Sequence, residues 1–229
     1  MNQAKILPVF LVFALLVAPF RAAAQYLPAG RPDVVALLAP PPAPGSAEQA
    51  ADLAEAFAVY SARTPAEEAA AKAESKFTPF AFARAIGPWF QPGKFPKTEA
   101  LFHEVEAEAE TIIDAGKDYW KRPRPYTTDR RFVHITPEKS FSYPSGHSTR
   151  ATVFALVFAE LFPAKRDALL AIGRDIGWHR VLGGAHYPTD IYAGRVLGQA
   201  IVREFIASPA FQHDLGEAKA ELAAMAAQP

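Results

Sequence analysis

Helix-start signals recur along this chain, and apolar residues return between them at helical rather than alternating spacing. Ser46, with Gln49 three residues later, forms a capping-box pattern, and Thr64 precedes a proline that suits the first turn of a helix. Pro188 gives the same signal for a helix that continues through Phe205. The sequence has almost no strand-like alternation, no internal repeat and no interdomain linker. It therefore predicts an all-α fold, built as a single-domain helical bundle.

The same reasoning places the remaining helices. A helix capped by Thr98 is expected to end before the prolines within 121–125, because the residue before a proline avoids the helical conformation. Its predicted buried face consists of Leu101, Val105, Ala109, Ile112 and Gly116. Further helices are expected over 65–76, 146–162, 163–178 and 209–225.

Two proline-rich segments interrupt this pattern. Residues 26–45 form an arm whose end, APPPAPG, favours an extended polyproline II strap on the surface. Residues 77–95 carry several phenylalanines and a tryptophan among prolines. Two interpretations of this second segment stay open, namely core packing under a loop and an apolar wall or lid over a substrate pocket.

Residues 1–24 have the composition of a removable secretory signal. Lys5 charges the start, an apolar run covers 6–20, and alanines at 22–24 match the small-residue cleavage pattern. The run is short for a membrane span, which needs ~20 apolar residues, and an uncleaved anchor is the alternative. No later segment predicts a span. We expect a signal peptide at 1–24, a mature domain at 25–229, and delivery to the periplasm or the cell exterior.

The charge balance excludes some classes of partner. Basic and acidic residues number 24 each, so nothing attracts the chain in bulk to nucleic acid or to an anionic membrane. Cysteine is absent, so the protein folds without disulfides. Basic residues nevertheless concentrate between 117 and 131, and we interpret this local cluster as part of a site.

The stretch from Arg180 to Asp190 combines three groups that can act on one anion. His186 stands at the entry to the helix that Pro188 begins, and Asp190, four residues on, can reach its imidazole. A carboxylate on one ring nitrogen fixes the tautomer and leaves the other nitrogen with a free lone pair. Arg180 offers a fork of donors suited to an oxyanion. Standing alone, these residues would fit a capped helix with a surface histidine and a salt bridge equally well.

Two clusters upstream strengthen the catalytic interpretation. Lys117 ends a helix and Arg124 stands in a proline-stiffened loop, so both cations can be held toward one point. Residues 145–147 begin another helix, where exposed N–H groups and the positive end of the dipole favour an anion. Such an array suits a phosphate and the charge-spread transition state of phosphoryl transfer. His186 is then the candidate nucleophile, and His147 the candidate acid for the leaving oxygen.

Three blocks carry a resemblance to a known family. Lys117-x6-Arg124-Pro125, Pro144-Ser-Gly-His147 and Arg180-x5-His186-x3-Asp190 are similar in order and spacing to the acid phosphatase and vanadium haloperoxidase superfamily, which includes the type 2 phosphatidic acid phosphatases. Outside the blocks, Tyr143 and the segments 37–46 and 208–212 resemble the bacterial class A non-specific acid phosphatases. The resemblance covers nearly all of residues 25–229.

This resemblance implies an all-helical bundle that hydrolyses a broad range of phosphomonoesters through a phosphohistidine. In that scheme His186 attacks phosphorus, Asp190 orients it, and His147 protonates the leaving group. The residues that would hold the phosphoryl oxygens are Lys117, Arg124, Ser145, Gly146 and Arg180. The scheme needs no metal or other cofactor, and the resemblance implies a homo-oligomer. Phosphate or vanadate should inhibit, since vanadate can adopt five-coordinate geometry at the position of phosphorus.

Two departures and three alternatives accompany this interpretation. His179 stands where the family commonly has serine, and Lys121-Arg122-Pro123 adds charge and stiffness, so pocket detail rather than reaction class is in question. A metal hydrolase could use His186 and Asp190 as ligands, although three converging cations would repel a divalent ion. A vanadate-dependent haloperoxidase shares the same anion-binding residues. The non-enzymatic alternative is a helical phosphate- or phospholipid-binding protein.

Overall fold

The computed structural model describes residues 25–133 and 138–226, and every regular element within these ranges is a helix. The predicted signal peptide at 1–24 lies outside the described residues. The longer helices are α2 (Ala47–Ala62), α3 (Pro65–Ala73), α5 (Pro96–Trp120), α7 (Gly146–Leu161), α8 (Arg166–Leu182), α9 (Pro188–Ala207) and α10 (Pro209–Ala226). Shorter ones are α1 (Val34–Leu37), α4 (Ala83–Ile86), α6 (Pro125–Thr128), η1 (Glu74–Lys76), η2 (Pro79–Phe82) and η3 (Pro163–Lys165). The all-α prediction is confirmed.

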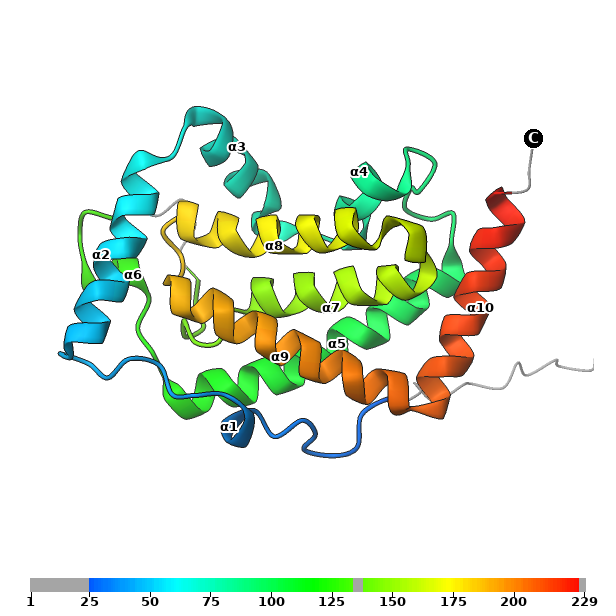
Figure 1. Ribbon diagram of the computed structural model, residues 1–229, viewed down its shortest axis with the longest axis horizontal. Helices are drawn as coiled ribbons and strands as arrows, with labels where there is room; N and C mark the ends of the chain where they lie inside the picture. Colours follow the sequence, from blue (N-terminus) through cyan, green and yellow to red (C-terminus); the bar gives the residue numbers. More distant parts are fainter. Residues whose placement is uncertain (1–24, 134–137, 227–229) are drawn as a thin grey trace, which may run out of the picture.

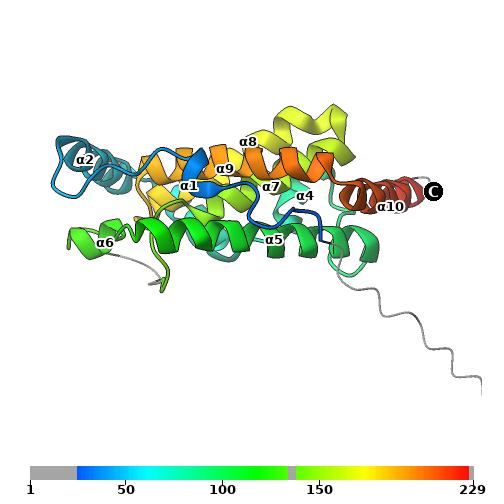
Figure 2. The ribbon, with the colours of Figure 1, turned by 90° about the horizontal axis from the view of Figure 1, so that it is seen from below.

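Helix α7 forms the centre of the bundle. It packs against α8 and α9, which flank it in Figure 1, and against α5, which runs along the opposite side of the bundle in Figure 2. Phe154 and Phe158 of α7 are fully buried, and the ring of Phe158 stacks on Phe102 of α5 with centroids 4.2 Å apart. Apolar residues therefore surround α7, as expected of a helix enclosed by others.

Glycines let α8 and α9 approach α7 closely. A Cβ at Gly173 of α8 would lie 2.8 Å from the carbonyl oxygen of Ala151. A Cβ at Gly198 of α9 would lie 2.9 Å from the carbonyl oxygen of Thr149. Side chains larger than hydrogen would push these helices apart, so glycine fixes the spacing of the three helices.

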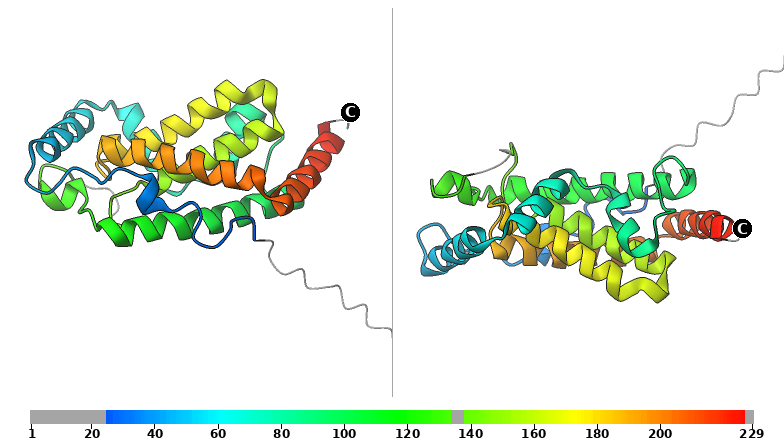
Figure 3. Two further views of the ribbon diagram at one scale, coloured as in Figure 1. Left: turned by 60° about the horizontal axis from the view of Figure 1, so that its bottom comes forward. Right: turned by 90° about the horizontal axis from the view of Figure 1, so that it is seen from above.

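The long helices bring their ends together at one end of the bundle. The C-terminal ends of α5 and α8 and the N-terminal ends of α7 and α9 lie at the left of Figure 1, close to α2 and α6. Helix α10 lies at the other end, as both views of Figure 3 show. The backbone N–H of Ser145 donates to the carbonyl of Asp190 at 3.1 Å, which joins the start of α7 to the first turn of α9. The predicted site residues lie on these four helix ends and on the loops beside them.

Two predicted helix boundaries were wrong. Thr98 does not cap α5, because that helix begins at Pro96, and the buried Thr98 hydroxyl donates instead to Glu221 of α10 at 2.8 Å. Helix α8 continues beyond 178 to Leu182, which places Arg180 in the last helical turn. Within the described ranges, no helix is both long and apolar enough to cross a membrane.

The arm at 26–45 follows the outside of the bundle, with α1 as its one-turn helix. Glu108 of α5 accepts hydrogen bonds from the backbone N–H groups of Tyr26 and Leu27, at 2.6 and 2.7 Å. Tyr143 donates to the carbonyl of Ala39 at 2.5 Å, so the proline segment is anchored directly beside the second motif block.

Glycine spacing gives a first prediction. Gly198→Ala should lower the free energy of unfolding, because an overpacking cost of about 1–3 kcal/mol outweighs the roughly 1 kcal/mol that alanine adds in helix propensity. Gly216→Ala is the matched control, since nothing lies within 4 Å of a Cβ at that exposed position of α10. Urea denaturation should show a loss for the first variant and a small gain for the second. Equal stability of Gly198→Ala and the wild type would mean that α9 can move away from α7 without cost.

Candidate active site

His186 and Asp190 meet at the start of α9, which confirms the predicted i, i+4 contact. His186 Nδ1 lies 3.1 Å from Asp190 Oδ2, and both side chains are almost completely buried. The same carboxylate oxygen accepts from the backbone N–H of Tyr187 at 3.0 Å and from Ser142 Oγ at 2.5 Å. Arg124 Nη1 lies 3.1 Å from His186 Nε2. Because a guanidinium only donates, this contact requires an unprotonated Nε2, with the ring proton on Nδ1 facing the carboxylate.

Electrostatics keep this imidazole neutral. Burial lowers the pKa of His186 well below its usual value, and the positive charge of Arg124 lowers it further. Burial raises the pKa of Asp190, and the charge of Arg122 is the largest opposing influence. At neutral pH His186 therefore carries its lone pair on Nε2, as a nucleophile requires.

Three of the predicted cations converge near Nε2 of His186. Lys117, Arg124 and Arg180, here called the cation cradle, are each at most 6% exposed. Lys117 Nζ donates to Ser140 Oγ at 2.9 Å, and Arg124 Nε donates to the Ser140 carbonyl at 2.8 Å. The positive charges of the cradle are thus held at the end of α5, in the following loop and at the end of α8.

The carboxylate of Glu138 bridges two members of the cradle. Glu138 Oε2 accepts from Arg124 Nη2 at 2.8 Å, and Oε1 accepts from Arg180 Nη2. The charges of both arginines lower the pKa of Glu138 against the effect of burial. The sequence analysis did not find this residue, because it belongs to none of the three motif blocks.

The start of α7 contributes the remaining predicted residues. A Cβ at Gly146 would lie 3.6 Å from Lys117 Nζ, an ordinary contact distance, so the start of α7 lies next to the cradle. Ser145 is buried and caps α7 by accepting from the backbone N–H of Ser148 at 3.3 Å. A contact of its hydroxyl with an anion stays a prediction.

His147 is held from one side by the segment before the aromatic cluster. Its Nε2 lies 3.0 Å from the carbonyl oxygen of Ser75, which fixes the ring proton on that nitrogen in the neutral form. The ring of Phe77 packs on it with centroids 5.6 Å apart. Burial lowers the pKa of His147 well below its usual value, and the charges of Arg180 and Arg150 lower it further.

His179 supports this arrangement from α8. Its Nδ1 donates to Glu74 Oε2 at 2.5 Å, and Glu74 stands directly before Ser75 in η1. The departure from serine at this position therefore ties the end of α8 to the segment that holds His147.

Arg122 and Asp52 are two further residues that the motif blocks missed. The sequence analysis noted Arg122 only as added charge beside Lys121 and Pro123. The residue is 5% exposed, and its guanidinium pairs with Asp190 Oδ1 at 2.6 Å. Asp52 of α2 pairs with the same guanidinium at 2.6 Å. The signal for Asp52 was present in the sequence, since it stands one helical turn before Ala56 and two before Tyr60, on the buried face of α2.

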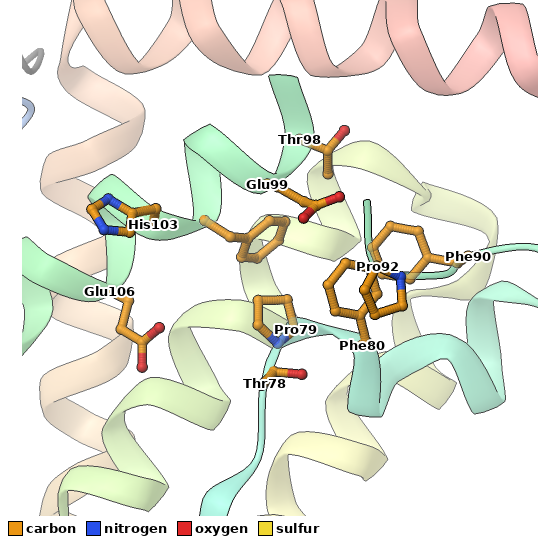
Figure 4. Close-up of a pocket in the computed structure, with 10 residues that line it drawn as sticks. Thr78, Pro79, Phe80, Phe90, Pro92, Thr98, Glu99, His103 and Glu106 are labelled. Carbon is orange, nitrogen blue, oxygen red and sulfur yellow. The ribbon is translucent and has the colours of Figure 1, made fainter. Parts of the chain in front are cut away.

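The aromatic segment at 77–95 mainly packs in the core, as the first of its two interpretations expected. Phe82, Phe90 and Phe95 are at most 1% exposed. A cavity of about 340 Å³ lies between this segment and α5. Figure 4 shows Phe80 and Phe90 at one side of it, and no predicted site residue lines it. Phe77 connects the segment to the candidate site through His147.

Comparisons with known proteins identify the family of this chain. The sequence profile of the PAP2 superfamily matches residues 105–213. A non-specific acid phosphatase of Providencia stuartii is 30% identical over 201 residues, which cover 83% of this chain and 81% of that protein. The chain belongs to the PAP2 superfamily. The resemblance inferred from the three motif blocks is thereby confirmed.

Two further relatives define how far the similarity extends. A non-specific acid phosphatase of Salmonella typhimurium is 32% identical over 147 residues, 62% of this chain, and the match spans only 59% of that protein's length. Among solved structures, a transmembrane PAP2 type phosphatidylglycerolphosphate phosphatase from Bacillus subtilis is 22% identical in sequence. It aligns with a TM-score of 0.55 over 76% of this chain and 89% of that one, which shows a shared fold.

The site places three buried cations beside a neutral, oriented imidazole. The positive charges of the three cradle cations exceed the negative charge of Glu138, so the site has net positive charge that suits a phosphoryl group. Across 25–133 and 138–226, no three His, Cys, Asp or Glu side chains group as a metal site.

Anion binding gives the second prediction. Inorganic phosphate should raise the melting temperature of the wild type, since a ligand at 100 times its Kd stabilises the folded state by about 2.7 kcal/mol. Lys117→Met should lose most of this shift. Lys139→Met is the matched control, because it removes the same charge from an exposed position in the neighbouring loop. Thermal unfolding at constant ionic strength checks this, and equal shifts in both variants would place the anion elsewhere.

Proposed function

We propose that this protein is an acid phosphatase that hydrolyses phosphomonoesters through a phosphohistidine at His186. The observation that carries the proposal is the orientation of this imidazole. Asp190 holds the Nδ1 side, and the Nε2 lone pair points to Arg124 in the cation cradle. The relatives named as non-specific acid phosphatases favour this activity over haloperoxidase chemistry.

In the first step the cation cradle binds the phosphoryl oxygens, and Gly146, which lies next to Lys117, adds its backbone N–H. Nε2 of His186 attacks phosphorus, the phosphorus–oxygen bond of the ester breaks, and the leaving oxygen takes a proton from His147. The proton on Nδ1 stays between the ring and Asp190, whose negative charge balances the cationic phosphoimidazole.

In the second step water replaces the alcohol. The now neutral His147 removes a proton from the water, whose oxygen attacks phosphorus while the phosphorus–nitrogen bond breaks. Inorganic phosphate leaves, and His186 regains its lone pair. Fixed cations do the charge stabilisation, so the scheme requires no metal ion.

Substrate binding prepares His147 for its role as the acid. Burial and two arginines hold its pKa low in the free enzyme, so it carries a proton only at acidic pH. A phosphoryl dianion in the cradle offsets those arginine charges and raises the pKa of His147. As pH rises, the free enzyme loses this proton first, so kcat/KM should fall on the alkaline side at a lower pH than kcat.

The proposal also covers where the enzyme is located and how it assembles. The signal-like composition of residues 1–24 and the similarity to bacterial acid phosphatases support a periplasmic or secreted enzyme. The resemblance supports a homo-oligomer that acts on a broad range of small phosphomonoesters.

The bridge made by Glu138 gives the third prediction. Its carboxylate lies between Arg124 and Arg180, where the proposal places phosphoryl oxygens, so substrate has to displace it. Glu138→Gln keeps the size but removes the competing charge, and the inhibition constant of inorganic phosphate should fall by roughly tenfold, or about 1.4 kcal/mol. Glu55→Gln, an exposed change on α2, is the control and should bind phosphate as the wild type does. Weaker phosphate binding by Glu138→Gln would mean that Glu138 orders the arginines instead of competing for them.

The fourth prediction separates the two histidines. With labelled nitrophenyl phosphate and a chelator present, rapid quench should trap acid-labile, base-stable label on the wild type and none on His186→Ala. His147→Ala should accumulate the label, because nitrophenolate leaves without much protonation while the water still needs a base. Its steady-state rate with alkyl phosphates should fall by ~10²–10⁴-fold.

Other outcomes of the same experiment would reject the proposal. Label that persists in His186→Ala, or appears on a serine or aspartate, would identify a different nucleophile. Activity that disappears with the chelator and returns with zinc or magnesium would replace the fixed-cation scheme by a metal hydrolase.

A further inference from the structure

On the Nδ1 side of His186, a single guanidinium lies between two buried carboxylates. Arg122 Nη1 is 2.6 Å from Asp190 Oδ1, and Arg122 Nη2 is 2.6 Å from Asp52 Oδ2. The three side chains are at most 5% exposed. The group joins residues from α2, the loop after α5 and α9. Asp52 lies outside the three motif blocks, and Arg122 occupies an unspecified position within the first.

Further contacts fix the plane of this guanidinium. Arg122 Cζ lies 3.8 Å from the centre of the Tyr187 ring, and Nη1 also donates to Thr189 Oγ1 at 2.7 Å. Thr189 in turn donates its hydroxyl proton to Asp52 Oδ2 at 2.5 Å. A stacked, forked guanidinium of this kind holds its partners in one orientation, which a lysine could not do.

The charges of the three groups do not cancel. Two carboxylates and one guanidinium sum to one negative charge, located beside Nδ1 of His186. If Arg122 paired with Asp190 alone, the pair would be neutral and would offer little compensation to a cationic ring. Asp52 engages the other side of the guanidinium, so Asp190 keeps its charge for the imidazole. The total becomes zero when the His186 ring turns cationic, which happens when Nε2 bonds to phosphorus.

We propose that Asp52 and Arg122 are positioning residues for the nucleophile, which act through Asp190 and make α2 part of the catalytic apparatus. Arg122 keeps Asp190 ionised and oriented, and Asp52 neutralises Arg122 so that the charge of Asp190 serves the cationic ring of His186. This inference rests on the proposed phosphohistidine function. It predicts that changes at α2 affect bond formation at Nε2 and leave anion binding in the cation cradle intact.

Asp52→Asn is the decisive variant, because the amide keeps an oxygen that can accept from Arg122 and Thr189 while the negative charge is lost. We expect kcat to fall by about 10- to 100-fold. This is the loss typical when the hydrogen-bond partner of a metal-bound histidine is changed, and such a partner likewise orients an imidazole. The dissociation constant of inorganic phosphate should stay within about twofold, which also reports an intact fold. Glu55→Gln removes the same charge from the exposed face of α2 and should keep the wild-type kcat.

Vanadate distinguishes this inference from the proposed function. It can bond to Nε2 and make the ring cationic, whereas phosphate is held by the cradle alone. In calorimetry without any turnover, Asp52→Asn should weaken vanadate binding by about the same factor as kcat and leave phosphate binding unchanged. If the wild type hydrolysed no phosphomonoester, the proposed function would fail. The difference between vanadate and phosphate affinity in Asp52→Asn would still show whether Asp52 supports a cationic ring at His186.

A double variant tests the charge argument directly. Arg122→Gln leaves two buried carboxylates without their cation, whereas Arg122→Gln combined with Asp52→Asn leaves Asp190 alone beside His186. By the charge argument the double variant keeps one net negative charge beside Nδ1, whereas in Asp52→Asn the charge of Arg122 cancels that of Asp190. The double variant should therefore bind vanadate more tightly than Asp52→Asn, despite carrying one more substitution. Additive losses in the double variant would overturn the inference. So would a lowered melting temperature of Asp52→Asn with unchanged kcat, or an equal loss of phosphate and vanadate affinity.

Discussion

Burial of charge is the constraint on which this end of the bundle depends. Four cations with at most 6% exposure stand within one region, namely Lys117, Arg122, Arg124 and Arg180. A buried cation is tolerated only with partners that replace water, and removing one partner leaves a strongly unfavourable charge. The loop after residue 137, the first turn of α9 and the inner face of α2 provide these partners. The positions of those segments follow from the cations that they satisfy.

The partners divide into two sets on opposite edges of one imidazole. Near Nε2 of His186 the positive charges exceed the carboxylate of Glu138, and near Nδ1 the carboxylates exceed Arg122. This asymmetry draws an anion to one nitrogen and keeps a proton on the other. Burial is the main cause of the low pKa of His186, and the charge of Arg124 adds to it. The same arrangement of charges explains the tautomer, and in the proposed mechanism it would stabilise a cationic phosphoimidazole.

Local patterns in the sequence were enough to predict the members of the site that share a helix or a motif block. The contact between His186 and Asp190 follows from their spacing, since Pro188 begins the helix that carries Asp190 and His186 stands two residues before that helix. The helical spacing of Asp52 indicated a buried position, but its pairing with Arg122, 70 positions away, could not be found in this way. Glu138 had no such signal, since it lies in a loop and pairs with Arg124 and Arg180, 14 and 42 positions away. Their selection depends on which charges are buried, and that is known only after the helix ends have met.

Contacts between distant residues also explain the wrongly predicted start of α5 and the role of His179. Thr98 looked like a cap, but its hydroxyl satisfies Glu221 from α10, a tertiary contact that no local pattern contains. His179 and Arg180 are consecutive residues of α8, so their side chains leave the helix about 100° apart. Arg180 therefore reaches Glu138 in the cradle, while His179 reaches Glu74 beside the segment that holds His147. His179 thus contacts the segment that supports His147, the proposed proton donor, and not the cradle.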